Sequence, residues 1–183
     1  KFDASCGGHR VPFLARWPDK IEAGSVSDPL IRNIDLMATL AALTGQTLNP
    51  NEGPDSFDIL PALISNDQEP IRDHLVQMAS RKTHLALRSG NWVYIGAKGG
   101  GGFSGTKPGE HLLGGPAALK FAGQVNSEIE DGRIKKGASS AQLYNLKLDP
   151  SQRKNVIRQF PVRARSMRYQ LEEIRKVSSS RNL

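Results

Sequence analysis

The chain has 183 residues, of which 38% are hydrophobic, and carries a formal net charge of +7. This length fits one ordinary domain, but the hydrophobic fraction is low for a domain that covers its own core, so we expect another surface to complete it. No apolar run is long enough to span a membrane, and a single cysteine excludes an internal disulfide.

The N-terminal stretch joins a cation to a short apolar run. Lys1 is followed by Gly7 and Gly8, which allow the backbone to turn tightly or to approach another group closely, and then by His9. Residues 11–17 read Val-Pro-Phe-Leu-Ala-Arg-Trp, and we predict a short buried strand there. A cation and a histidine on a loop before a core strand are typical of a functional site.

Apolar residues at helical spacing predict a helix over residues 35–44, with Asp35 as its N-cap. We expect the apolar face of this helix to pack into a core. A short helix is expected over 58–64, a helical turn over 116–121, and a longer helix over 161–177 with arginines on its outer face.

Short β-prone runs predict an antiparallel meander over residues 75–78, 84–88 and 92–95. Ser-Gly-Asn at 89–91 is a hairpin turn signal between the last two strands. A final strand is expected over 141–146, and residues 131–140 are expected to be loop.

The segment from 96 to 115 is rich in glycine. It does not fit a dinucleotide site, because Pro108 argues against the helix that such a site requires. Two interpretations are equally open, a flexible surface loop and a loop that contacts substrate. In the second case Lys107, Glu110 and His111 would face the mouth of an active site.

Five landmarks along the chain resemble the sulfatase family in order and spacing. They are Lys1 with Gly7-Gly8-x-Arg10-Val-Pro-Phe13, Asp35-Leu-Met-Ala-Thr39 with Leu43-Thr-Gly45, Asp55-Ser-Phe-Asp-Ile-Leu-Pro61, Leu87-Arg-Ser-Gly-Asn-Trp92, and Leu143-Tyr-Asn-Leu-Lys-Leu-Asp-Pro150 with Asn155. The resemblance covers nearly the whole chain, which looks like the C-terminal part of an arylsulfatase-type enzyme. One departure is Cys6, which stands where the family usually has glutamate.

This resemblance implies an α/β architecture, the alkaline-phosphatase-like sulfatase fold. Residues 1–70 would form the C-terminal part of the large α/β sulfatase domain. Residues 71–183 would form the small C-terminal antiparallel sheet subdomain with its packed terminal helix. The N-terminal sulfatase domain would then be a partner of this chain, and the location would be periplasmic or extracellular.

The activity implied by the resemblance is hydrolysis of sulfate esters, on a sulfated small molecule or a polysaccharide. The intact enzyme would use a calcium ion and a formylglycine derived from Cys or Ser. In the family, the metal ligands and the Cys/Ser-x-Pro-x-Arg motif lie ahead of the lysine, so we expect no metal site here and no activity of this fragment alone. Cys6 and Arg10 have that motif's spacing, but Gly8 replaces the proline. Cys6 is therefore interpreted as an ordinary cysteine.

Three residues are candidates for the site. Lys1 occupies the position of the family's sulfate-binding lysine, and the resemblance implies that it contacts the sulfate and stabilises the leaving group. The alternative is a solvated N-terminal lysine. His9 is a candidate substrate contact, the alternative being packing and hydrogen bonding on its loop, and His111 is a further candidate contact. The scattered histidines do not form a metal site.

Three rival functions remain open. They are a phosphoesterase or phosphonate hydrolase with the same fold, a non-catalytic module that binds anionic glycans or nucleic acid, and a degenerate pseudoenzyme, which Cys6 in place of the usual acid suggests. The positive charge favours acidic partners in general. Nucleic-acid binding also requires exposed aromatic residues for stacking. Only 6% of the residues are aromatic, and most lie in predicted strands. We therefore expect no nucleic acid as a partner. We also expect no membrane as a partner, because no apolar run is long enough to span one.

Overall fold

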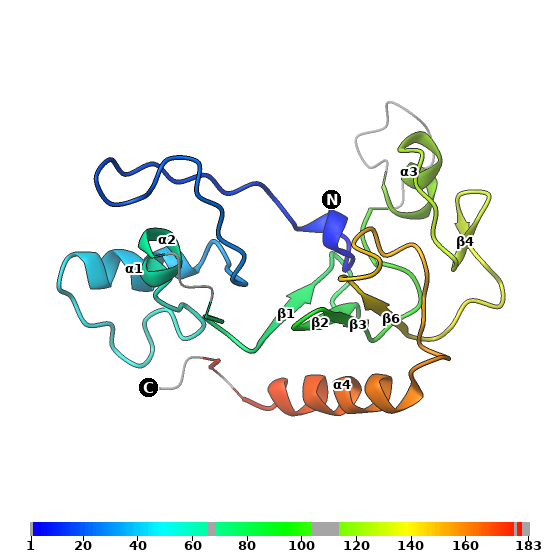
Figure 1. The fold of residues 1–183 in the computed structure, drawn as a ribbon. Helices are drawn as coiled ribbons and strands as arrows, with labels where there is room; N and C mark the ends of the chain where they lie inside the picture. Colours follow the sequence, from blue (N-terminus) through cyan, green and yellow to red (C-terminus); the bar gives the residue numbers. More distant parts are fainter. Residues whose placement is uncertain (1, 66–68, 104–113, 178, 181–183) are drawn as a thin grey trace. The chain divides into compact units, whose positions relative to one another are not determined.

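A computed structural model describes residues 2–65, 69–103, 114–177 and 179–180 (Figure 1). The chain forms two compact units. The sheet unit comprises Lys1–Val11 and Leu75–Leu171, and the helical unit comprises Pro12–His74 and Glu172–Leu183. The predicted division after residue 70 concerns the domains of the intact enzyme and stays a prediction. Across the described residues, we find no helix with the length and apolar character needed to cross a membrane.

A four-stranded sheet forms the centre of the sheet unit, in the order β1-β2-β3-β6. Its strands are β1 (His74–Met78), β2 (Leu85–Ser89), β3 (Trp92–Ile95) and β6 (Gln142–Asn145). The pairs β2–β3 and β3–β6 are antiparallel. Gly90 closes the β2–β3 hairpin with a φ of +53°, a left-handed conformation that glycine adopts without strain. The predicted strands and hairpin are confirmed.

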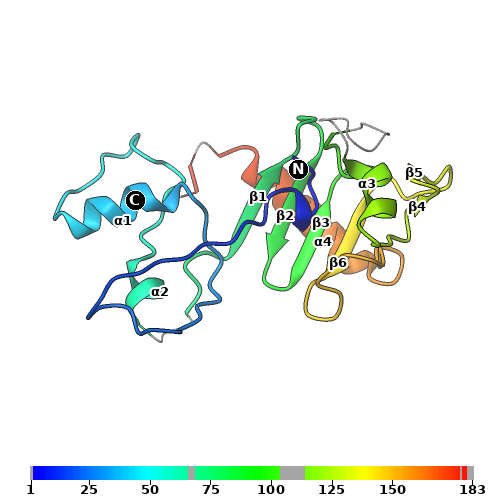
Figure 2. The same cartoon turned by 90° about the horizontal axis from the view of Figure 1, so that it is seen from above.

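One face of this sheet is covered by the N-terminal residues. The register places Ala86 opposite Ile95 and Val93 opposite Tyr144. These four side chains form a buried cluster with Ala4. Figures 1 and 2 show the N-terminal segment lying over this side of the sheet. The stretch that carries the candidate site is therefore part of the core of the sheet unit.

The opposite face is covered by α4 (Pro161–Ile174), as both views show (Figures 1 and 2). Leu87, Tyr94 and Leu143 are paired neighbours on this face and are buried. The helix buries one stripe of its surface, which comprises Ala164, Met167 and Leu171. Burial of a Leu or Met side chain contributes about 1.5–3 kcal/mol, so this stripe holds α4 on the sheet. The predicted helix is confirmed, although it ends three residues earlier than expected.

The sheet unit also contains α3 (Gly115–Phe121) and a small hairpin of β4 (Ile129–Glu130) and β5 (Arg133–Ile134). The prediction that residues 131–140 are entirely loop is wrong at β5. Asp131 and Gly132 have φ values of +49° and +69°, as in the two-residue turn that best matches the twist of a hairpin. The Asp-Gly dipeptide at residues 131–132 is typical of such a turn and indicates it in the sequence.

The helical unit contains α1 (Asp35–Leu43) and α2 (Leu60–Ile64), which confirms the predicted helices. The predicted capping role of Asp35 is wrong. Its carboxylate is fully buried and accepts hydrogen bonds from the backbone N–H of Arg32 at 2.6 Å and of Phe57 at 3.1 Å. It also forms an ion pair with the buried Arg72. Because these partners occupy both oxygens, Asp35 joins three segments and does not cap its own helix.

Two apolar surfaces predicted to be buried are exposed. Residues 11–17 form no strand in the described structure, and Leu14 is 94% exposed. A strand requires a neighbour to satisfy its backbone N–H and C=O groups, and the described residues supply none here. The apolar face of α1 is also exposed, by 38–58% at its large side chains. That face consists of Leu36, Met37, Leu40 and Leu43.

Candidate active-site loop

Residues 2–10 form a compact loop over the sheet, with η1 (Cys6–Gly8) as its one helical turn. The backbone N–H of Ser80 donates to the carbonyl of Phe2 at 2.9 Å, and the N–H of Phe2 donates to the carbonyl of Gly8 at 3.1 Å. The N–H of Ala4 donates to the carbonyl of Gly100 at 2.8 Å. Lys1 itself lies outside the described residues, but the residue bonded to it is held by the sheet unit.

Gly8, but not Gly7, makes the close approach to another group that the sequence predicts for the Gly-Gly pair. A Cβ atom at Gly8 would lie 2.1 Å from the carbonyl oxygen of Asp3, a distance that no side chain can tolerate. Nothing lies within 4 Å of the corresponding position at Gly7. The close approach of Asp3 to residue 8 within the loop therefore requires a glycine at that position.

Part of the glycine-rich segment packs against the same loop. A Cβ atom at Gly100 would lie 1.9 Å from the carboxylate of Asp3, and one at Gly102 would lie 3.0 Å from its Cα. The N–H of Arg81 donates to the carbonyl of Gly101 at 3.0 Å. Residues 99–102 thus lie directly beside the N-terminal loop. Lys107, Glu110 and His111 lie outside the described residues, and their contact with substrate stays a prediction.

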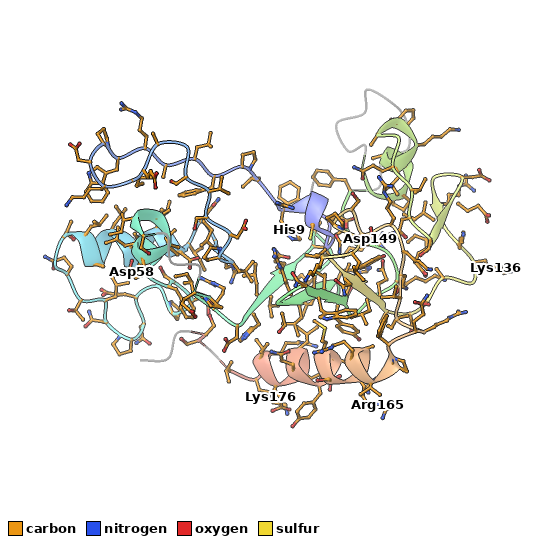
Figure 3. All side chains as sticks on the ribbon, in the orientation of Figure 1. His9, Asp58, Lys136, Asp149, Arg165 and Lys176 are labelled. Carbon is orange, nitrogen blue, oxygen red and sulfur yellow. The ribbon has the colours of Figure 1, made fainter. Side chains whose placement is uncertain are left out.

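His9 is half-buried on this loop (Figure 3). Its Nδ1 atom lies 3.2 Å from the carbonyl oxygen of Asp3. Because a carbonyl only accepts hydrogen bonds, Nδ1 carries the proton and Nε2 is the free acceptor of the neutral ring. Burial lowers the pKa of His9, with a smaller contribution from the charge of Arg88, while the bond to Asp3 and its charge oppose this shift. This geometry fits the packing role, and substrate contact by His9 stays a prediction.

Cys6 is anchored by its backbone. Its N–H donates to Oε1 of Gln152 at 2.7 Å. Burial raises the pKa of the Cys6 thiol, and the charges of Arg88 and Arg10 only partly oppose that effect. A protonated thiol is a poor nucleophile, which supports the interpretation of Cys6 as an ordinary cysteine.

Sequence reasoning missed the polar network that supports this loop. The Asn126 side-chain amide donates to the carbonyl of Gln152 at 2.7 Å and to the hydroxyl of Tyr144 at 3.0 Å. That hydroxyl donates to Oε1 of Gln142 at 2.7 Å. Gln142 in turn donates to the carbonyl of Gly99 at 2.9 Å. The network thereby links the residue that binds Cys6 to the glycine-rich segment, and no local pattern in the sequence indicates it.

The described residues offer no set of ligands for a calcium ion. Among them, no group of three or more His, Cys, Asp or Glu side chains is placed to hold a metal. His84 is engaged elsewhere, since its ring nitrogens lie 3.1 Å from the Thr83 hydroxyl and 3.1 Å from the carbonyl of Lys98.

No family model matches the chain. The chain is 31% identical over 175 residues to an N-acetylgalactosamine-6-O-sulfatase of Bacteroides thetaiotaomicron, covering 96% of this chain and 29% of that protein. It is 45% identical over 64 residues to arylsulfatase A of Homo sapiens, covering 35% of this chain and 12% of that protein.

A solved structure is similar over almost the whole chain. Its description concerns the metabolism of multiple glycosaminoglycans by Bacteroides thetaiotaomicron and ends in the designation BT33336S-sulf. The TM-score is 0.70 at 29% sequence identity, covering 97% of this chain and 31% of that one.

These similarities confirm the class of fold predicted from the sequence, which is the alkaline-phosphatase-like α/β fold. Within that class, the chain belongs to the sulfatase family and corresponds to a C-terminal portion of it. It spans less than a third of the length of these relatives.

Proposed function

We propose that this chain is the C-terminal portion of a sulfuric ester hydrolase that cleaves sulfate esters of a sulfated glycan. The observation that carries this proposal is the match over 175 residues to an N-acetylgalactosamine-6-O-sulfatase. The similar solved structure, described in the context of glycosaminoglycan metabolism, supports a glycan as substrate. The matches favour this function over a non-catalytic glycan-binding module.

In this proposal Lys1 binds the sulfate group. A fixed cation beside the sulfate oxygens stabilises the negative charge that moves to the leaving oxygen during hydrolysis. The anchoring of Phe2 to Ser80 and of Ala4 to Gly100 supports such a role, because a cation acts best when the backbone that carries it is held. His9 and His111 are proposed as further substrate contacts.

The intact enzyme would contain a calcium ion and a formylglycine, which we assign to segments that precede Lys1 in the family. No described residue of this chain is assigned to either group, and the chain alone is expected to be inactive. We also propose a periplasmic or extracellular location, on the family resemblance alone. Fractionation of cells that produce the intact protein would test the location.

The partner that completes the structure is proposed to be the N-terminal sulfatase domain. The apolar face of α1 and the apolar residues at 11–17 are both exposed in the described structure. Large exposed apolar patches generally mark interaction surfaces. A domain from the rest of the polypeptide would cover them and would offer a neighbour to the extended segment at 11–17.

The test is an assay of the intact protein with an oligosaccharide that carries 6-O-sulfated N-acetylgalactosamine, with released sulfate measured by ion chromatography. We expect sulfate release, and the substitution Lys1→Met should lower kcat by roughly 10²-fold or more, as loss of one charge-stabilising group does elsewhere. Lys147→Met, at an exposed position of the sheet unit, serves as the control and should leave the rate unchanged.

Two results would contradict this proposal. Release of phosphate from phosphate esters, with no sulfate release from any sulfated glycan or aryl sulfate, would establish a phosphoesterase. Full activity of the Lys1→Met protein would show that the cation at this position does not bind the sulfate.

A further inference from the structure

A basic hollow of about 550 Å³ lies on the surface of the sheet unit. Neither the N-terminal loop nor residues 99–102 contribute to its described lining. Four cations and two carboxylates line it, namely Lys135, Lys136, Lys154, Arg158, Glu128 and Glu130.

Hydrogen bonds hold the two walls of the basic hollow together. The N–H of Ser127 donates to the carbonyl of Arg153 at 2.7 Å, and the N–H of Asn155 donates to the Ser127 hydroxyl at 2.8 Å. The carboxylate of Glu128 accepts from the N–H of Ser139 at 2.7 Å. Lys98 donates from Nζ to the carbonyl of Lys136 at 3.0 Å. The cations are therefore carried by segments whose backbones are fixed to one another.

The charges of the basic hollow favour an anionic ligand. In the part of the chain that the structure describes, none of its four cationic side chains forms an ion pair. One of the two carboxylates, Glu128, already accepts a backbone N–H. Hydrogen bonds between Lys or Arg and an oxyanion are about twice as strong as neutral ones, so a sulfate or carboxylate group would be bound there.

A saccharide fits this hollow better than a nucleic acid does. Hydroxyl groups of a sugar can donate hydrogen bonds to the Glu130 carboxylate in the lining. Binding of single-stranded nucleic acid uses aromatic side chains on which bases stack, and no aromatic residue is among the described lining residues.

We propose that the basic hollow binds an oxyanion group, sulfate or carboxylate, of an anionic oligosaccharide. This inference rests on the proposed function only for the saccharide nature of the ligand. The site would hold a charged unit of a glycan chain through Lys154 and Arg158 on one wall and Lys135 and Lys136 on the other.

The experiment measures binding of the intact protein to three fluorescent dextran oligosaccharides of equal length, carrying sulfate groups, carboxymethyl groups or no charge. The double substitution Lys154→Gln with Arg158→Gln removes one Lys and one Arg from the basic hollow. The control, Lys147→Gln with Arg165→Gln, removes the same charges from exposed positions outside it. Figure 3 shows that Lys136, which lines the basic hollow, and Arg165, one of the two control positions, lie on different parts of the sheet unit.

We expect the first variant to bind the charged dextran about tenfold more weakly, which corresponds to about one charge-assisted hydrogen bond, and the control to bind within about twofold of wild type. Weaker binding of the sulfated dextran alone identifies the bound group as sulfate, and weaker binding of the carboxymethylated dextran alone identifies it as carboxylate. Circular dichroism checks that each variant is folded, and Lys135→Gln with Lys136→Gln replaces the first variant should it fail to fold.

Four outcomes would overturn the inference. The first is an unchanged affinity of the first variant, and the second is an equal loss in both variants, which indicates attraction by net charge alone. The others are no binding to either charged dextran, and binding of a single-stranded DNA of equal charge more tightly than the charged dextrans. None of these outcomes depends on sulfate release. An active sulfatase with an unchanged affinity in the first variant would therefore refute anion binding by the basic hollow and leave the proposed function standing.

Discussion

His9 shows how the surroundings of one side chain restrict its chemistry. It is half-buried, and its Nδ1–H is committed to the carbonyl of Asp3. The same burial that lowers its pKa keeps the ring neutral near pH 7. A neutral ring with Nε2 free can accept a hydrogen bond from a sugar hydroxyl, but it does not supply a positive charge. In the proposed site, the charge would therefore come from Lys1.

This lowered pKa predicts a loss of stability in acid. Above the ordinary pKa of 6.5, both the folded and the unfolded chain hold His9 neutral. As the pH falls below 6.5, the unfolded chain binds a proton that the folded chain resists, so the free energy of unfolding decreases until the pH passes the lower folded-state pKa. His9→Asn keeps a donor near the position of Nδ1 but does not titrate. Urea denaturation at pH 7.5 and pH 5.5 should therefore show a smaller loss for His9→Asn than for wild type. Equal losses would show that another group is responsible.

At the scale of elements, the N-terminal loop and the glycine-rich segment form one structure. Both Gly8 and Gly100 lie so close to Asp3 that a side chain at either position would collide with it. At residues 99–102, the glycine-rich segment packs closely against the N-terminal loop and supports it. The N-terminal loop and the glycine-rich segment are separate features in the sequence. The contact between them places both beside one candidate site.

Gly100→Ala should destabilise the sheet unit because its Cβ would displace the Asp3 carboxylate, whose Oδ1 accepts hydrogen bonds from the backbone N–H and the hydroxyl of Ser5. Overpacking of this kind costs about 1–3 kcal/mol. Gly137→Ala is the matched control, since nothing lies within 4 Å of its Cβ position and its φ is not positive. Denaturant unfolding of both variants measures the difference. A Gly100→Ala protein as stable as the control would mean that the loop does not pack on this segment.

At the scale of the whole molecule, the apolar face of α1 lacks the cover that a core residue normally has. The sheet unit has a closed core between α4 and the N-terminal loop, whereas α1 leaves Leu36, Leu40 and Leu43 at least 38% exposed. A low hydrophobic fraction predicts incomplete coverage of the core, and the exposed face of α1 in the helical unit is one such uncovered surface. The proposed N-terminal sulfatase domain would supply the missing contacts.

Leu40→Glu should have different effects on stability in the 183-residue chain and in the intact protein. In the 183-residue chain, where Leu40 is 58% exposed, it should change stability little and increase solubility. In the intact protein it should lower the free energy of unfolding by about 1.5–3 kcal/mol, the contribution of a buried leucine. Leu148→Glu, at a residue that is 81% exposed on the sheet unit, is the comparison. Similar effects of the two substitutions in the intact protein would exclude α1 as the docking face.

The sequence by itself determined the family, the helices and the four main strands. Those features depend on landmarks and periodicities within short segments, which a single sequence displays directly. The tertiary structure decided what local patterns cannot show. Asp35 binds Arg72 across 37 positions, and Cys6 binds Gln152 across 146. Residues 11–17 lack a strand because pairing depends on a neighbour and not on the run itself. Contacts between distant segments require the folded chain, because only folding brings their atoms together.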